Sequence, residues 1–492
     1  MGDAHDVVVV GAGAAGCVIG ARLAEAGSSV LLVEAGPDRR GAVAPALRDG
    51  WRLPAGADWD VDWGFRSEPD ADGETTPLRR GRLVGGTSWL TRFAVRGSLD
   101  DLEAWDVDGW TPEDLLPAFV RLENDLDHPD QPWHGDAGPI PIGRALDVPA
   151  TPALAAIGAA MERSGFPPVD DHNAPGAVGV GRMPMSVRDG LRATTADAYL
   201  APERVPSTLT VLPDRTVDAV ILDDDRASGV RLADGSVIEA GRVVLSAGVY
   251  GSPPILLRSG IGPADELREL GVTVRVPLDG VGRNLRDHPG VEVAPAYHGP
   301  GRDAPLLHTI ATFHSDGARA DGPPDLLLWT SDPSGDPPEL GIAAVLMKPR
   351  GGGTVRLRSA DPSDAPRIDL PPLDDTDVDR LLEACRRAHE VVSDPAVRAG
   401  CGDPPPAFGN DDASRARVRA EAYSLPHVVG TCAMGRSPEA GAVVDADGRV
   451  HGTDGLHVID ASIVPEPPSG FPHLWAIAVA ERLSHVLSGR RT

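Results

Sequence analysis

The first thirty-six residues alternate between apolar runs and glycine turns. Four consecutive valines, Val7 to Val10, are followed directly by a glycine, which is typical of a strand buried on both faces of a parallel sheet. Apolar residues then recur at helical spacing as far as Gly27, and a second apolar run ends at Glu34. The pattern predicts a strand, a turn, a helix and a second strand.

Apolar patterning also marks elements farther along the chain. The run that starts at Val243 begins as a buried strand and turns at Ser252, where two prolines follow. Near the C-terminus, the sequence PPSGFPHLWAIAVAERL predicts an apolar helix after a proline turn. A single histidine, His473, stands at the start of that helix, where neither the turn nor the helix needs an imidazole.

The turn between the first strand and the first helix carries three glycines in the spacing GxGxxG. Gly11 permits the tight turn, Gly13 allows a pyrophosphate to approach the backbone, and Gly16 allows the helix and the strand to pack closely. Glu34, at the end of the second strand, can accept hydrogen bonds from both hydroxyls of an adenosine ribose. The segment therefore predicts a dinucleotide-binding clamp, and both FAD and NAD fit it.

Length and charge narrow the class of protein. The chain has 492 residues, enough for two or three domains, and its 57 glycines and 48 prolines indicate a globular protein with many turns. The formal net charge of -27 argues against nucleic acid and against acidic membrane surfaces as partners, because both bind proteins through clustered Lys and Arg.

The cysteines and the apolar segments bear on the compartment. Cys17, Cys385, Cys401 and Cys432 are scattered along the chain, so neither a disulfide framework nor a metal site is predicted. The N-terminal sequence MGDAHD lacks the basic region of a secretory signal, and the longest apolar stretch is interrupted by glycines, unlike a membrane span. We therefore expect a cytoplasmic enzyme without a membrane span.

Five further motifs follow one another along the chain. They are Gly85-Gly86-Thr87-Ser88, Ser246 to Gly262, Val281 to His288, His427 to Gly435 and Val458 to Pro465. Together with the N-terminal clamp they resemble, over nearly the whole chain, the glucose-methanol-choline (GMC) family of FAD-dependent oxidoreductases, which includes choline dehydrogenase-like enzymes. Six motifs in the family's order are far more specific than any one of them.

The resemblance implies FAD as the cofactor and an α/β fold in which two domains are interleaved. A Rossmann-like FAD-binding domain would comprise residues 1–150, 205–290 and 427–492. An α+β substrate-binding domain on a mostly antiparallel sheet would comprise residues 151–204 and 291–426.

The resemblance also implies roles for individual residues. His427 matches the family's catalytic histidine, and His473 matches its second catalytic position, which is His or Asn. The main chain of Val217 would contact adenine, and Gly86 and Asp460 would line the pyrophosphate and the flavin. The expected cofactor-binding residues are Gly11, Gly13, Ala14, Ala15, Gly16, Glu34, Ala35, Gly85, Gly86, Thr87, Ser88, Thr91, Val217, Asp460, Ala461 and His473.

Three positions depart from the family pattern. Thr91 replaces an asparagine near the flavin, and Phe471 replaces the first asparagine of the usual GNPN or GNPH. Leu90 takes the place of the histidine that some members link to the flavin, so we expect FAD to be bound non-covalently. Within the family, the short chain is similar to compact actinobacterial members, including the branch associated with the redox cofactor mycofactocin.

The implied reaction is the oxidation of an alcohol to a carbonyl. A neutral imidazole takes the hydroxyl proton, and hydride leaves the adjacent carbon for flavin N5. His427 is the expected base, and His473 is expected to hydrogen-bond the developing alkoxide. The acceptor that reoxidises FAD could be oxygen, a quinone or another redox carrier.

Two other functions are compatible with the same motifs. One is a hydroxynitrile-lyase-like enzyme that acts on a cyanohydrin without redox chemistry, and the other is a flavin-bound protein that serves as a binding partner without turnover. His288, in the loop RDHPG, is interpreted as a turn-forming residue. Trp89 and Trp475, adjacent to the flavin loop and to His473, are candidates for narrowing the substrate site.

Overall fold

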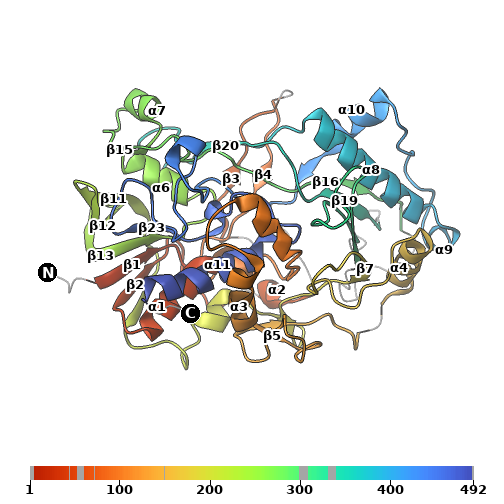
Figure 1. The fold of residues 1–492 in the computed structure, drawn as a ribbon, viewed down its shortest axis with the longest axis horizontal. Coiled ribbons are helices and arrows are strands. Elements are labelled where there is room, and N and C mark those ends of the chain that lie inside the picture. Colours follow the sequence, from red (N-terminus) through yellow and green to blue (C-terminus); the bar gives the residue numbers. More distant parts are fainter. Residues whose placement is uncertain are drawn as a thin grey trace.

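The computed structural model describes residues 5–43, 45–51, 60–70, 73–148, 150–297, 309–330 and 340–489. Figure 1 shows two parts side by side along the long axis of the molecule. One part contains the N-terminal strands, and the other contains a second sheet beside the long helix α8 (Asp375–Val392).

The first sheet joins strands from three separate segments of the chain. Its strand order is β10-β2-β1-β13-β12-β11, and β23 also pairs with β13. The strands are β1 His5–Val10, β2 Val30–Val33, β10 Leu209–Leu212, β11 Val217–Asp223, β12 Arg226–Leu232, β13 Val237–Leu245 and β23 Leu456–Val458. β12 pairs antiparallel with β11 and β13, whereas the other pairs are parallel. The valines of β1 are buried at its centre, as their run predicts.

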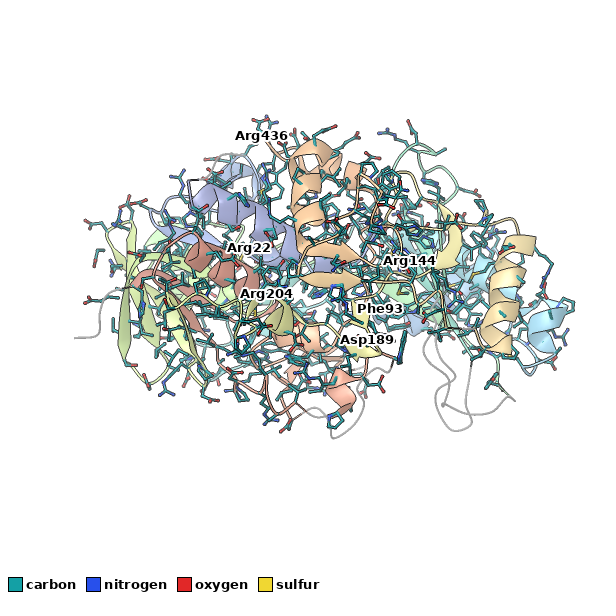
Figure 2. All side chains as sticks on the ribbon, turned by 90° about the horizontal axis from the view of Figure 1, so that it is seen from below. Arg22, Phe93, Arg144, Asp189, Arg204 and Arg436 are labelled. Atoms are coloured by element: carbon teal, nitrogen blue, oxygen red, sulfur yellow. The ribbon has the colours of Figure 1, made fainter. Side chains whose placement is uncertain are left out.

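Three long helices pack together beside this sheet. α1 (Ala14–Glu25) follows β1 directly and contacts α11 (Pro472–Leu487), which also contacts α3 (Pro112–Leu122). The Arg22 guanidinium of α1, labelled in Figure 2, lies 2.8 Å from the buried carboxylate of Glu481 in α11. The first and last helices of the chain therefore lie side by side. The C-terminal helix and the glycine turn after β1 thus belong to the same part of the fold.

The second sheet is antiparallel, with the strand order β22-β16-β19-β18-β17-β7. Its strands are β7 Gly179–Arg182, β16 Pro289–Val293, β17 Thr309–Phe313, β18 Leu326–Thr330, β19 Ile342–Leu346 and β22 Tyr423–Ser424. α8 packs on one face of the sheet. Alternating residues of the other face, Leu327, Ala343 and Val345, form a separate apolar cluster with Phe93 and Phe471.

The remaining elements connect and cover the two sheets. The helices are α2 Pro45–Arg48, α4 Pro152–Arg163, α5 Thr195–Tyr199, α6 Ser252–Arg258, α7 Ala264–Glu269, α9 Pro395–Arg398 and α10 Asp412–Glu421. The paired strands are β3 Phe65–Arg66 with β4 Pro77–Leu78, β5 Glu123–Asp125 with β6 Ile140–Ile142, β8 Val187–Arg188 with β9 Leu191–Arg192, β14 Ile261–Gly262 with β15 Val276–Pro277, and β20 Thr354–Arg356 with β21 Arg367–Asp369.

The architecture is the interleaved α/β arrangement that the resemblance implies, with a Rossmann-like sheet in one part and an antiparallel sheet in the other. The domain bounds given above stay a prediction. Within the described ranges, every helix is too short or too polar to cross a bilayer.

Candidate active site

A cavity of about 360 Å³ extends from the glycine turn after β1 to the start of α11. Its volume lies in the range of small-molecule sites, roughly 300–1,000 Å³. The expected site residues on its wall are Gly11, Gly13, Ala14, Ala15, Glu34, Ala35, Gly86, Thr87, Thr91, Val217, His427, Asp460, Ala461 and His473. Gly16, Gly85 and Ser88 do not line it.

The three glycines of the turn face different surroundings. Gly11 has a φ of 94°, and a Cβ there would approach the Ser246 carbonyl oxygen to 2.6 Å. A Cβ at Gly16 would lie 1.8 Å from the Gly11 carbonyl oxygen, so this glycine packs the helix against the turn. A Cβ at Gly13 would meet no atom within 4 Å, which leaves open space at the N-terminus of α1, where an anion is favoured.

The carboxylate of Glu34 is fixed on the cavity wall. It accepts hydrogen bonds from the backbone N–H of Ala12, at 2.9 Å, and from that of Gly36, at 2.8 Å. Burial raises the pKa of Glu34 to about 7, against the opposing effect of these two bonds. Its position at the end of β2 is the one that a ribose-binding carboxylate requires.

The loop at residues 85–88 packs directly against the glycine turn. The N–H of Gly85 donates to the Ala12 carbonyl over 2.7 Å, and a Cβ at Gly86 would lie 2.7 Å from the Cα of Gly13. Ser88 is buried, and its hydroxyl donates to the Gly85 carbonyl over 2.6 Å. Gly85 and Ser88 therefore support the loop, whereas Gly86 and Thr87 reach the cavity.

Asp460 joins the C-terminal segment to the first sheet. Its Oδ2 accepts from the N–H of Gly248, at 2.9 Å, and from the hydroxyl of Ser252, at 2.6 Å. Its Oδ1 accepts from the N–H of Ser462, at 2.7 Å. The carboxylate thus holds the backbone around Ala461 at the cavity wall.

His427 lies half-buried on the same cavity wall. Its backbone N–H donates to Asp287 Oδ1 over 2.7 Å, and its ring centroid lies 4.6 Å from that of Phe471. Burial, with a smaller contribution from the Arg80 guanidinium, lowers the pKa of His427 to about 3. The imidazole is therefore neutral at pH 7.

His473 reaches the same cavity from the first turn of α11. Pro472 begins the helix, and its fixed φ suits that position. Burial, with a smaller contribution from Arg192, lowers the pKa of His473 to about 4. Two neutral imidazoles thus line the same cavity as the dinucleotide-type clamp.

These residues fit FAD. The open space at Gly13 leaves room for a pyrophosphate, and the Glu34 carboxylate is positioned for a ribose. The neutral histidines on the same wall would supply groups that can move a proton for the flavin's chemistry.

Comparison with known proteins decides the family. Two family models, both described as GMC oxidoreductase, match residues 5–290 and 349–480. A GMC-type oxidoreductase of Rhodococcus erythropolis is 36% identical over 500 residues, which covers 99% of each chain. The chain is a GMC oxidoreductase.

Other GMC relatives are named for the alcohols that they oxidise. The 5-(hydroxymethyl)furfural oxidase of Methylovorus sp. is 32% identical, and the match covers 98% of each chain. The pyridoxine 4-oxidase structure from Mesorbium loti has a TM-score of 0.90 at 29% identity and covers 99% of this chain and 100% of its own. The expected fold class and the expected enzyme class, an FAD-dependent oxidoreductase acting on alcohols, are confirmed.

Sequence reasoning missed two side chains next to His427. The Nδ1 atom of His288 lies 3.2 Å from the Nδ1 atom of His427, although the RDHPG loop indicates only a turn. Arg80 lines the cavity, and its Nη2 donates to the Pro426 carbonyl over 3.0 Å. The available signals were the Asp-His pair of the motif at 281–288 and the arginines that precede the Gly85 loop.

The two candidate tryptophans do not line the cavity. Trp89 is buried, and its indole N–H donates to the Val84 carbonyl over 2.9 Å. Trp475 packs against Trp105 and Phe119, and its N–H donates to the Arg96 carbonyl over 2.7 Å. Both support the loops that form the cavity, so the expectation that they narrow the substrate site is wrong.

A buried acidic group lies outside the cavity. The ligand-type atoms of Glu123, Asp125 and His134 lie within 4.8 Å of one another. Arg144, labelled in Figure 2, is 2.9 Å from Asp125. Burial opposes a charge on His134, but hydrogen bonds to Asp171 and Glu123 outweigh it and raise the pKa to about 9. With these contacts His134 and Arg144 offset the charge of the carboxylates, and the group forms a buried ion-pair network.

Proposed function

We propose that this GMC oxidoreductase converts an alcohol to a carbonyl, with His427 as the base and His473 as the hydrogen-bond donor to the alkoxide. The observation that carries the proposal is the single cavity whose wall holds both the dinucleotide clamp and the two histidines. FAD, when bound, supplies the hydride acceptor.

His427 has to be neutral to act as the base, because a protonated imidazole has no lone pair for the hydroxyl proton. The pKa of about 3 keeps it neutral at pH 7. As negative charge develops on the substrate oxygen next to it, the imidazole becomes more basic, since an opposite charge stabilises its protonated form. The proton therefore moves to the ring as the alkoxide forms.

His473 is suited to the second role because it is also neutral. A neutral imidazole keeps one N–H, which it can donate to an oxygen atom. A donor aimed at developing negative charge in a site that excludes water lowers the barrier. Its place at the rigid start of α11 supports such an orientation.

The Phe471 ring on the cavity wall next to His427 favours an alcohol with an aromatic or other apolar group. Phe93 and Trp329 pack behind Phe471 with centroid distances of 5.8 Å and 6.0 Å, and Figure 2 shows Phe93 near the middle of the molecule. A sugar would leave a hydroxyl unpaired against the Phe471 ring, which costs about 1–3 kcal/mol for each buried polar group.

Anaerobic mixing of the FAD-loaded protein with benzyl alcohol, choline and glucose tests the function. We expect benzyl alcohol to bleach the flavin absorbance and to appear as its aldehyde, and glucose to react much more slowly. Equal rates with glucose would refute the substrate preference alone. Carbonyl release from a cyanohydrin without bleaching would identify a lyase, and no reaction with any compound would identify a binding protein.

FAD is expected to be bound non-covalently. Leu90 directly follows the 3₁₀ helix Gly86–Trp89, and its aliphatic side chain offers no nucleophile for a link to the flavin. Acid precipitation of the loaded protein should release all of the flavin into the supernatant. A yellow pellet would contradict this prediction.

We also propose that the enzyme acts in the cytoplasm. The four cysteines are free and buried, which supports a reducing compartment. The net charge of -27 supports a small-molecule substrate and acceptor rather than nucleic acid as partners.

A further inference from the structure

His288 lies directly behind His427 and is fully buried. Its Nδ1 atom is 3.2 Å from Nδ1 of His427, and its Nε2 atom is 3.1 Å from the carbonyl oxygen of Pro468. The two imidazole rings are nearly perpendicular, at 85°, with their centroids 5.3 Å apart. His288 therefore bridges His427 and the loop that leads to His473.

These contacts determine which ring nitrogens carry protons. A carbonyl oxygen only accepts hydrogen bonds, so the contact with Pro468 places a proton on Nε2 of His288. A neutral imidazole carries one proton, so Nδ1 of His288 has a lone pair. The proton between the two Nδ1 atoms then belongs to His427. A neutral His427 with its proton on Nδ1 has its lone pair on Nε2.

We propose that His288 is a positioning residue that fixes His427 in the tautomer whose Nε2 lone pair is free to accept the substrate proton. The inference rests on the proposed role of His427 as the base. A free imidazole prefers its proton on Nε2, which would turn a donor rather than a lone pair toward the alcohol. The contact with His288 reverses that preference.

The proton balance of the step is simple. The hydroxyl O–H bond of the substrate breaks, and its proton forms a bond to Nε2 of His427. The Nδ1–H of His427 stays in place and donates to Nδ1 of His288, in a bond that strengthens because its donor is now charged. His288 gains no proton and acts only through His427.

Burial and the surrounding charges keep His288 neutral. Burial lowers the pKa of His288 well below its usual range, and the neighbouring His427 and the Lys348 ammonium lower it further. Lys348 donates to the Pro467 carbonyl over 2.7 Å and lies 2.8 Å from the Asp101 carboxylate. The residue that disfavours charge on His288 also holds the loop to which His288 donates.

Asp287 fixes the spacing between the two histidines. Its Oδ1 accepts from the backbone N–H of His288, at 2.8 Å, and from that of His427, at 2.7 Å. The hydroxyl of Ser424 donates to its other oxygen. The backbone groups of Arg286 and Val429 also pair, at 3.0 and 3.1 Å. The segments 284–288 and 427–429 are thus joined as a unit.

Histidine-selective ¹⁵N NMR of the oxidised, FAD-loaded protein tests the tautomer directly, with the His427 signals assigned from the His427→Gln variant. We expect a protonated Nδ1 and an unprotonated Nε2 on His427 in the wild type. His288→Leu should lose this preference and slow flavin reduction by roughly 10–100-fold, a part of the 10²–10⁴-fold typical of a general base. Alcohol affinity should change little.

His288→Gln is the matched rescue, because its amide oxygen can accept from His427 and its NH₂ can donate to Pro468. It should recover most of the rate and the tautomer. His457→Leu, which removes a buried histidine that does not line the cavity, should change neither the rate nor the tautomer of His427. If His288→Leu fails to fold, the wild-type spectrum still shows which ring nitrogen of His427 carries the proton.

A wild-type His427 protonated on Nε2 would overturn the inference, and so would a His288→Leu variant with unchanged tautomer and rate. Failure of the proposed function has a different signature: His427→Gln would then reduce its flavin as fast as the wild type, whatever the spectrum shows.

Discussion

Replacing His427 with alanine should slow anaerobic flavin reduction by roughly 10²–10⁴-fold, the usual contribution of a general base. The neutral imidazole on the cavity wall is the group that we expect to take the hydroxyl proton, and alanine leaves no acceptor there. FAD content should stay near that of the wild type, because the clamp at Gly13 and Glu34 is built from other residues of the cavity wall. Stopped-flow absorbance with one good alcohol measures the rate.

His473→Ala should also slow flavin reduction, and His473→Asn should be milder because an amide can still donate to the alkoxide. If the two histidines act on the same proton transfer, the double variant should be scarcely slower than the poorer single variant. His485→Ala, at the far end of the same helix, is the matched control. If the rate losses of the two single variants multiply in the double variant, the histidines act independently. If His427→Ala reduces its flavin as fast as the wild type, His427 is not the base.

The residues of the proposed nucleotide clamp could be located from the sequence because their signals are local. The turn at Gly11, Gly13 and Gly16 and the carboxylate of Glu34 lie within one strand, helix and strand unit. The GxGxxG spacing also predicts that Gly13 faces the ligand and that Gly16 serves packing. The packing agrees with this division, because a Cβ at Gly16 would lie 1.8 Å from the Gly11 carbonyl oxygen and one at Gly13 would meet no atom within 4 Å.

The arrangement around His427 could not be predicted in the same way because it depends on distant contacts. His288 and His427 are 139 residues apart in the sequence. They meet because Asp287 binds both backbone segments and because β16 begins at Pro289. The residues next to His288 in the sequence predicted only a proline turn. The same limit explains Trp475, which is next but one to His473 in sequence yet packs away from the cavity.

Gly13→Ala and Gly16→Ala should separate cofactor binding from folding. A methyl group at Gly13 enters open space on the cavity wall, so the apoprotein should keep its Tm while FAD affinity falls about tenfold to a hundredfold, as an overpacking cost of about 1–3 kcal/mol implies. A methyl group at Gly16 meets a backbone oxygen at 1.8 Å, which cannot move without opening the turn. Apoprotein Tm should fall by roughly 6–12 °C for a cost of about 3 kcal/mol, at about 2–4 °C per kcal/mol.

Gly41→Ala is the control for both variants, because a Cβ at this exposed position also meets no atom within 4 Å and the residue lies off the cavity wall. It should change neither the Tm nor the affinity. Calorimetry of the apoproteins gives the Tm, and quenching of flavin fluorescence on titration gives the FAD affinity. If Gly13→Ala bound FAD as tightly as the control, the pyrophosphate would not approach the backbone at this turn. If it lowered the Tm as much as Gly16→Ala, Gly13 would be needed for folding, and the assignment of the glycine turn to the nucleotide would lose its support.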